Sequence, residues 1–241
     1  SLKTFSSFLA IGSGTSGGVE DSLAHTGSTL ASIIGRIFKL DQEEISIAIA
    51  AGMGSTIGGI LRLPFGGAVF SLELLYRRDF IIKSLYPAFL ASITSYIVSG
   101  VVLDWPSFLY IPQEFITKTT LQSIAAYGVI AAIIGIVGIG YVKIVQIFQR
   151  HFENMKIPLY LKPALGGVII GIFAIGFPEI LGTGYGWLQL AALGNHEIFP
   201  LWIMFPVIAM KIFATSVSNA SRNTTGLLGP SLVIGGLIGS A

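Results

Sequence analysis

The chain has 241 residues, of which 53% are hydrophobic and only 11% are charged, and its formal net charge is +2. Soluble domains carry about 25% charged residues, so this composition indicates a membrane protein surrounded by lipid. The small net charge gives no basis for a nucleic-acid partner. The chain has no cysteine, which excludes disulfides and thiolate metal sites. We expect no metal and no cofactor.

Charge-free runs predict the membrane-spanning helices, each of which needs about 20 apolar residues. The clearest runs are Ser84–Leu103 and Thr119–Val142, the second of which lies between Lys118 and Lys143. Shorter or interrupted apolar segments occupy residues 22–40, 45–61, 63–75, 163–178, 198–216 and 231–241. Charge-rich loops at 36–44, 77–83 and 150–162 are expected in water. The predicted fold class is all-α: a polytopic membrane protein with tilted and broken helices.

Two glycine- and hydroxyl-rich breaks, residues 12–21 and 218–230, each precede an apolar helix. Broken helices persist in lipid only where their free backbone groups line a cavity or contact a solute. A helix N-terminus carries unpaired N–H groups and the positive end of the helix dipole. Two such ends aimed at one point form an anion site without a full positive charge. We therefore expect the two breaks to lie together, whereas the alternative is that they are ordinary turns with close-packing glycines.

Acidic residues lie in or beside apolar segments, where an ionisable group is costly and points to function. Glu20 and Asp21 stand at the first break. Asp21 fits a helix cap, whereas Glu20 could occupy the anion site itself and swing away when protonated. Glu73 lies in an apolar stretch and either has a functional role or bonds to Arg77, its i+4 neighbour. Three cations near apolar spans either set a positive potential for anions or pair with Glu20 or Glu73: Lys3, Lys211 and Arg222.

Four short motifs stand in order along the chain. They are Gly18-Val19-Glu20-Asp21-Ser22, then Arg62-Leu63-Pro64-Phe65-Gly66-Gly67 with the trailing Phe70-Ser71-Leu72-Glu73, then Gly182-Thr183-Gly184-Tyr185-Gly186, and finally Gly226-Leu227-Leu228-Gly229-Pro230. Their order and spacing resemble the G-[K/R]-E-G-P, N-A-P-L-[A/S]-G, Gly-Tyr-Gly and G-x-F-x-P motifs of the CLC family of chloride channels and chloride/proton antiporters. The resemblance spans the whole chain, although no single motif is an exact match.

The resemblance implies an inverted-repeat fold and a homodimer in which each subunit holds its own anion pathway. It implies voltage-gated chloride transport rather than enzyme activity, in the plasma (inner) membrane. Residues 1–241 would form a single transmembrane domain, a fragment that lacks the N- and C-terminal helices and does not transport alone. Glu20 is the implied gate. The implied anion-binding residues are Gly18, Val19, Glu20, Gly226, Leu227 and Leu228, and Lys3 and Lys211 fall where the family tends to carry basic residues.

Departures from the family's first motif affect the anion site. Val19 replaces the usual basic residue, and Asp21 and Ser22 replace Gly and Pro. A second acid at this point should weaken anion binding unless it is protonated or turned away. A shift of one residue in the register would put Val19 at the gate position, but the register with Glu20 matches both the opening glycine and the acid. In the last motif, Leu228 stands for the family's phenylalanine.

A further departure concerns protons. Leu74 occupies the position where many antiporters of the family carry the inner proton-transfer acid. This favours a channel-like or weakly proton-coupled pathway over a chloride/proton antiporter, in which Glu20 and Glu73 would form the proton path. Alternatives from other classes are a cation-coupled carrier, a non-transporting membrane scaffold and an intramembrane enzyme. The histidines fall in no motif of an intramembrane protease: His25, His151 and His196.

Overall fold

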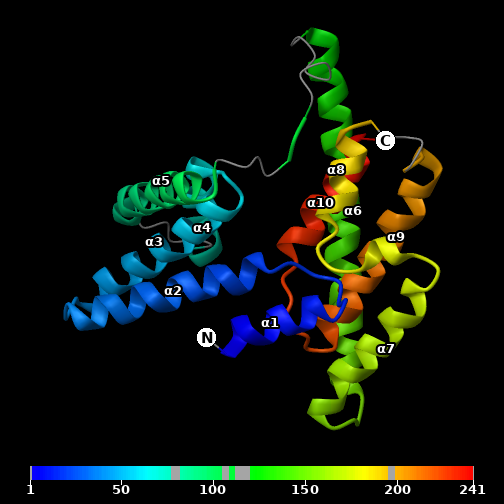
Figure 1. Cartoon of the computed structure of the whole chain (residues 1–241), viewed down its shortest axis with the longest axis horizontal. Coiled ribbons are helices and arrows are strands. Elements are labelled where there is room, and N and C mark those ends of the chain that lie inside the picture. Colours follow the sequence, from blue (N-terminus) through cyan, green and yellow to red (C-terminus); the bar gives the residue numbers. More distant parts are fainter. Residues whose placement is uncertain (1, 77–81, 105–108, 112–119, 195–198, 241) are drawn as a thin grey trace. The chain divides into compact units, whose positions relative to one another are not determined.

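The computed structural model describes residues 2–76, 82–104, 109–111, 120–194 and 199–240. Within these ranges every regular element is a helix, apart from one isolated β-bridge. The chain forms two compact units, drawn in Figure 1. Unit 1 comprises Ser1–Phe5 and Glu20–Phe108, and unit 2 comprises Ser6–Val19 and Leu109–Ala241. The predicted all-α class is confirmed.

Three helical segments of the described chain are long and apolar enough to cross a membrane. They are η1 (Ile82–Ser84) continued by α5 (Leu85–Val102), α6 (Leu121–Asn154) and α9 (Leu201–Ala220). Shorter apolar helices are α4 (Pro64–Leu75), η3 (Leu159–Leu161) continued by α7 (Lys162–Ala174), and α10 (Leu228–Ser240). The predicted mixture of spanning and broken helices is confirmed, and the chain is an integral membrane protein.

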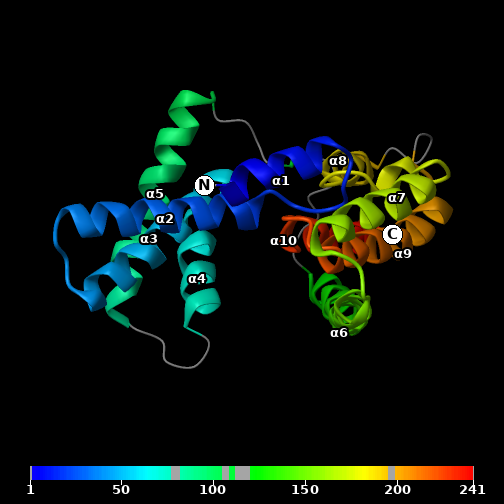
Figure 2. The same cartoon turned by 90° about the horizontal axis from the view of Figure 1, so that it is seen from below.

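Unit 1 is held together by close crossings of helices α2 (Glu20–Ile37), α3 (Gln42–Ile60), α4 and α5, with α3 in contact with the other three (Figure 2). Small residues let the backbones approach, as membrane interiors favour. A Cβ added to Gly67 of α4 would lie 2.5 Å from the backbone nitrogen of Gly58 and 2.9 Å from the carbonyl oxygen of Gly54, both on α3. At its start, α3 carries a capping box between Asp41 and Glu44, which satisfies two of its exposed amides.

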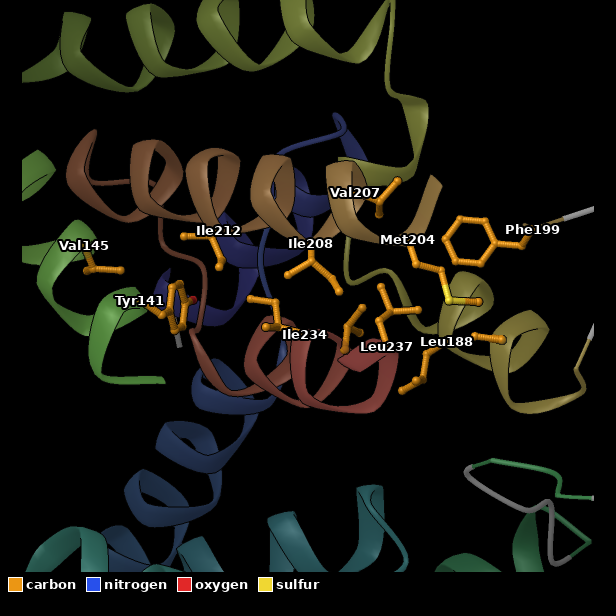
Figure 3. Close-up of a cluster of buried hydrophobic side chains, with 12 residues drawn as sticks. Tyr141, Val145, Leu188, Phe199, Met204, Val207, Ile208, Ile212, Ile234 and Leu237 are labelled. Atoms are coloured by element: carbon orange, nitrogen blue, oxygen red, sulfur yellow. The ribbon is translucent and has the colours of Figure 1, made fainter. Parts of the chain in front are cut away.

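Unit 2 is built around apolar side chains shared by α6, α9, α10 and the short helix α8 (Tyr185–Ala192). Figure 3 shows Ile208 and Ile212 of α9 facing Ile234 and Leu237 of α10. Between helices in lipid, such contacts stabilise through close van der Waals packing and not through removal of the side chains from water. The remaining labelled members of this core are Tyr141, Val145, Leu188, Phe199, Met204 and Val207. This packing fixes the position of α10 against α9.

Several predicted boundaries differ from the structure. The charge at Lys143 does not end the long helix: α6 runs on to Asn154 and has 34 residues, about 51 Å, against a hydrocarbon core of about 30 Å. Lys162 was expected in water but is buried at the start of α7, where its ammonium group donates to the Phe152 carbonyl near the end of α6. A lysine chain is long enough to satisfy a carbonyl that a helix end leaves unpaired.

Both breaks are also shorter than predicted. The first covers residues 13–19, between α1 (Leu2–Gly12) and α2, and the second covers residues 221–227, between α9 and α10. The hydroxyl-rich composition predicts an earlier end for α9 than the observed one at Ala220. Serine and threonine can continue a helix when their hydroxyls bond back to carbonyls of the preceding turn, as Ser216 does to Ile212 at 2.6 Å.

Candidate functional site

The two breaks have the same local structure, and equivalent residue numbers differ by 208 (226 minus 18). Each begins where a helix ends in a Schellman motif. At the end of α1, the Thr15 amide donates to the Ala10 carbonyl at 3.1 Å. At the end of α9, the Asn223 amide donates to the Ser218 carbonyl at 3.2 Å. This local repeat, with the whole-chain pattern of broken helices, agrees with the predicted inverted-repeat fold.

At the end of each helix, one residue with a left-handed backbone conformation turns the chain away from the helix axis. It is Gly14 in the first break, with φ 98°, and Arg222 in the second, with φ 63°. Glycine adopts this conformation without steric cost, whereas an arginine does so at a cost of about 1–2 kcal/mol. The second break therefore keeps the turn geometry of the first although its sequence lacks the glycine.

The two breaks meet at Gly18 and Gly226, which form an isolated antiparallel β-bridge. The Gly18 amide donates to the Gly226 carbonyl at 3.0 Å, and the Gly226 amide donates to the Gly18 carbonyl at 2.8 Å. Two residues beyond these glycines, α2 begins at Glu20 and α10 begins at Leu228. The expectation that the two breaks lie together is confirmed.

The bridge changes what the two glycines can do. Since the amides of Gly18 and Gly226 already donate to each other, they could serve an anion only if the bridge opened. Their role in this structure is to join the breaks, and absence of a side chain at both positions permits that approach. The first four amides of a helix have no partner within the helix. In the second break the helix that follows the bridge begins at Leu228, and the assignment of Leu227 and Leu228 to anion binding stays a prediction.

Hydroxyl groups reinforce the junction from both sides. Ser16 of the first break shares a hydrogen bond of 3.1 Å with Thr215 of α9. Thr224 of the second break donates to Ser6 of α1 at 2.9 Å. Each break is thus tied to the helix that precedes the other break, so the contact between the breaks does not depend on the β-bridge alone.

Glu20 is the first residue of α2 and is buried, with 2% of its surface exposed. It stands two residues after Gly18, so its Cα lies within about 7.6 Å of the Cα of that residue. A carboxylate in the first turn is favoured by the helix dipole. Val19 is half-buried beside it. The role of Glu20 as a gate stays a prediction.

The three predicted cations have different surroundings. Lys3 and Arg222 are exposed, whereas Lys211 in α9 is fully buried. Its ammonium group donates to the carbonyls of Ile180 at 2.9 Å and Gly182 at 2.8 Å. Within the described residues the one ion pair is a surface pair elsewhere, so Lys211 is satisfied by backbone carbonyls and not by an acid.

The loop at residues 180–184 completes the junction through a contact with the first break, which the sequence analysis does not predict. The Gly182 carbonyl accepts a hydrogen bond from the amide of Gly17 at 3.2 Å, next to the bridge residue Gly18. Gly182 and Gly184 both have positive φ, 60° and 86°. The Gly-Thr-Gly sequence was therefore the available signal of a special backbone, although it did not reveal the partner.

The acid proposed for the inner end of the proton path, Glu73, belongs to unit 1, whereas the junction belongs to unit 2. Glu73 and Leu74 are both exposed residues near the end of α4. Arg77, the possible partner of Glu73, lies outside the described residues.

Comparisons with known proteins agree with this geometry. The model of the family described as "Voltage gated chloride channel" matches residues 1–241. The chain is 27% identical over 240 residues to the voltage-gated ClC-type chloride channel ClcB of Escherichia coli, covering 99% of this chain and 56% of that protein. It therefore spans about half the length of this curated relative.

Two solved structures share the fold. A CLC-type fluoride/proton antiporter is 21% identical, with a TM-score of 0.76, over 92% of this chain and 54% of the other. A slow cyanobacterial Cl⁻/H⁺ antiporter is 19% identical, with a TM-score of 0.78, over 94% of this chain and 53% of the other.

Proposed function

The chain belongs to the voltage-gated chloride channel family, and we propose that it forms part of a pathway for chloride or a similar small anion across a membrane. The observation that carries the proposal is the bridge between Gly18 and Gly226, which joins two breaks that each lead into an apolar helix. The start of α10 supplies helix N-terminal amides and the positive end of a dipole beside this junction. Such a site attracts an anion without a full charge, so the anion can also leave.

Glu20 is proposed as the gate of this pathway. It is buried and directly follows the first break. When ionised, its carboxylate would compete with an anion for the amide donors near the junction. When protonated, it would lose that competition, so anion flux should depend on pH. Val19 is uncharged, so the site should attract an anion less strongly than a site that carries the basic residue of the family motif.

Channel-like or weakly coupled transport is proposed over chloride/proton antiport. Leu74 cannot ionise, and Glu73, the acid next to it, points about 100° around the helix axis from it. The second candidate is antiport, which the titles of both similar structures name as the activity of those proteins. The two are separated by recording external pH while chloride leaves loaded vesicles at a clamped potential. Proton uptake against its gradient in fixed ratio to chloride efflux would favour the antiporter.

We also propose a homodimer, with one pathway in each subunit, in the plasma (inner) membrane. This rests on family membership and has a simple test. The mass of the complete protein in detergent, after subtraction of bound detergent, should equal that of two chains. A protein that stays monomeric in detergent and in lipid would contradict it.

Chloride efflux from liposomes tests the proposed function itself. Vesicles that contain the complete protein and are loaded with chloride should release it when potassium permeability is supplied by an ionophore. Protein-free vesicles and vesicles loaded with gluconate provide the controls. Release no faster than from protein-free vesicles would contradict the proposal.

A further inference from the structure

Lys211 places an amino group where a buried polar group is unfavourable unless it is hydrogen-bonded. The side chain is fully buried in α9, and a buried ammonium group is tolerated only when its hydrogen-bonding capacity is met. Two backbone carbonyls meet it, those of Ile180 and Gly182, at 2.9 and 2.8 Å. Ile180 is the last residue of η4 (Pro178–Ile180), and Gly182 lies in the loop that leads from η4 to α8. The lysine thus holds this loop against α9.

The loop is shaped around the lysine. Gly184 has φ 86°, and a Cβ placed there would lie 3.3 Å from both Cε and Nζ of Lys211. An ordinary side chain at this position would be strained by its backbone and crowded by the lysine. Gly182 and Gly184 thus allow the backbone turn in the segment whose carbonyls at residues 180 and 182 accept from the Lys211 amino group.

The same loop also holds the first break. Gly182 receives two donors at its carbonyl oxygen, the Lys211 ammonium group and the Gly17 amide. Gly17 is followed by Gly18, which pairs with Gly226. A continuous series of hydrogen bonds therefore leads from Lys211 through Gly182 to the junction of the two breaks.

We propose that Lys211 is a positioning residue for the anion site: through Gly182 it fixes Gly17 and Gly18 at the junction of the two breaks. This inference rests on the proposed function. The other two predicted cations, Lys3 and Arg222, are exposed, and the motif's own basic position is Val19. Lys211 is therefore the buried cation that is connected to the junction by hydrogen bonds.

Two variants test whether the hydrogen-bond donors of Lys211, and not the volume of its side chain, hold the loop in position. Lys211→Met keeps a side chain of similar length but removes both the charge and the donors. Lys211→Arg keeps both. Lys162→Met is the matched control, because Lys162 is another buried lysine of unit 2 that donates to a backbone carbonyl, that of Phe152, with no described bond to the breaks.

The experiment uses the complete protein and two readouts. In Lys211→Met the apparent chloride affinity, from the concentration dependence of flux, should fall by about tenfold, as expected for loss of about one hydrogen bond's worth of binding free energy at a displaced junction. The maximal flux should change less. Hydrogen exchange at the amides of residues 17–18 should become faster by a similar factor. Lys211→Arg should restore both readouts to near wild type, and Lys162→Met should alter neither.

The outcomes that would overturn the inference are distinct from failure of the proposed function. Unchanged affinity or unchanged exchange in Lys211→Met would overturn it, as would an arginine variant as impaired as the methionine variant. If the wild-type protein carried no anion, the proposed function would fail and the affinity claim with it. The exchange at residues 17–18 would then still decide whether Lys211 holds the loop.

Discussion

Gly18 and Gly226 donate to each other's carbonyl oxygens, at 3.0 and 2.8 Å, although they are far apart in the sequence. The pairing is possible because both breaks turn out of their helices in the same way and reach the bridge after the same number of residues. A junction formed by two equivalent segments places the start of α10 next to the end of the first break. The proposed anion pathway depends on this contact.

The first prediction concerns Gly17, where a Cβ would overlap the side chain of Thr225. Gly17→Ala should destabilise the protein by about 1–3 kcal/mol, the usual cost of inserting a methyl group into a packed site. Chloride flux should fall because the two breaks are forced apart. The measurements are thermal unfolding in detergent and flux in vesicles.

A second substitution tests the cause of that effect. Thr225→Gly removes the opposing side chain, so adding it to Gly17→Ala should recover part of the lost stability. Gly12→Ala serves as the control, because a Cβ on Gly12 would meet no atom within 4 Å. Strictly additive effects of Gly17→Ala and Thr225→Gly would show that the two residues do not contact each other as described.

The second prediction concerns the crossing of α3 and α4 in unit 1. Gly67→Ala would place a methyl group 2.5 Å from the backbone nitrogen of Gly58, and backbone atoms cannot yield as a flexible side chain can. We expect a loss of at least about 1–3 kcal/mol. Gly66→Ala is the neighbouring control, since its Cβ would meet only the side chain of Leu63, at 3.4 Å. Equal stability of the two variants in detergent unfolding would contradict the close crossing.

The third prediction separates charge from strain at Arg222. This residue has φ 63° at a position where Gly14, its counterpart, is a glycine. Arg222→Gly should raise the unfolding free energy by about 0.5–1 kcal/mol through relief of that strain. Reduced chloride affinity in a variant that is more stable would then report the lost charge. A less stable variant would mean that the guanidinium group makes contacts that outweigh the strain.

Composition and charge-free runs were sufficient to predict the class of fold and most helices, because lipid imposes a simple rule on length and polarity. They located α5 well, with bounds at Leu85 and Val102 against the predicted 84–103. They failed at Lys143, since an exposed lysine can extend its charge away from the apolar region and does not end a helix. Beyond Lys143, α6 is supported by tertiary contacts such as that of Phe148 with Phe213, which composition does not show.

The candidate site was predicted in outline and not in detail. Glycine content located both breaks, and helix-dipole physics implied that they should meet. The sequence could not show that the amides of Gly18 and Gly226 would be consumed by their own bridge, because a backbone pairing leaves no mark on side-chain pattern. Nor could it assign Gly182 as the acceptor for Lys211, since that contact depends on how α9 and the loop before α8 pack together.

The fourth prediction concerns Glu20. Glu20→Gln keeps the shape of the side chain but removes its ionisable proton, so anion flux should rise at neutral pH and lose its dependence on pH. Folding should be intact, because glutamine is close in size and can still cap the helix start weakly. Flux is measured in vesicles between acid and neutral pH, with Glu153→Gln, a change at an exposed glutamate, as the control. Flux with the same magnitude and pH dependence as wild type would remove Glu20 from the gate.

The reversal potential under a chloride gradient tests the anion pathway most directly. The complete protein is placed in a planar bilayer with chloride concentrations that differ tenfold and with equal concentrations of impermeant cations. A chloride pathway with little proton coupling should reverse near the chloride equilibrium potential, about 60 mV for a tenfold gradient of a singly charged ion. A reversal potential that stays near zero would contradict the account.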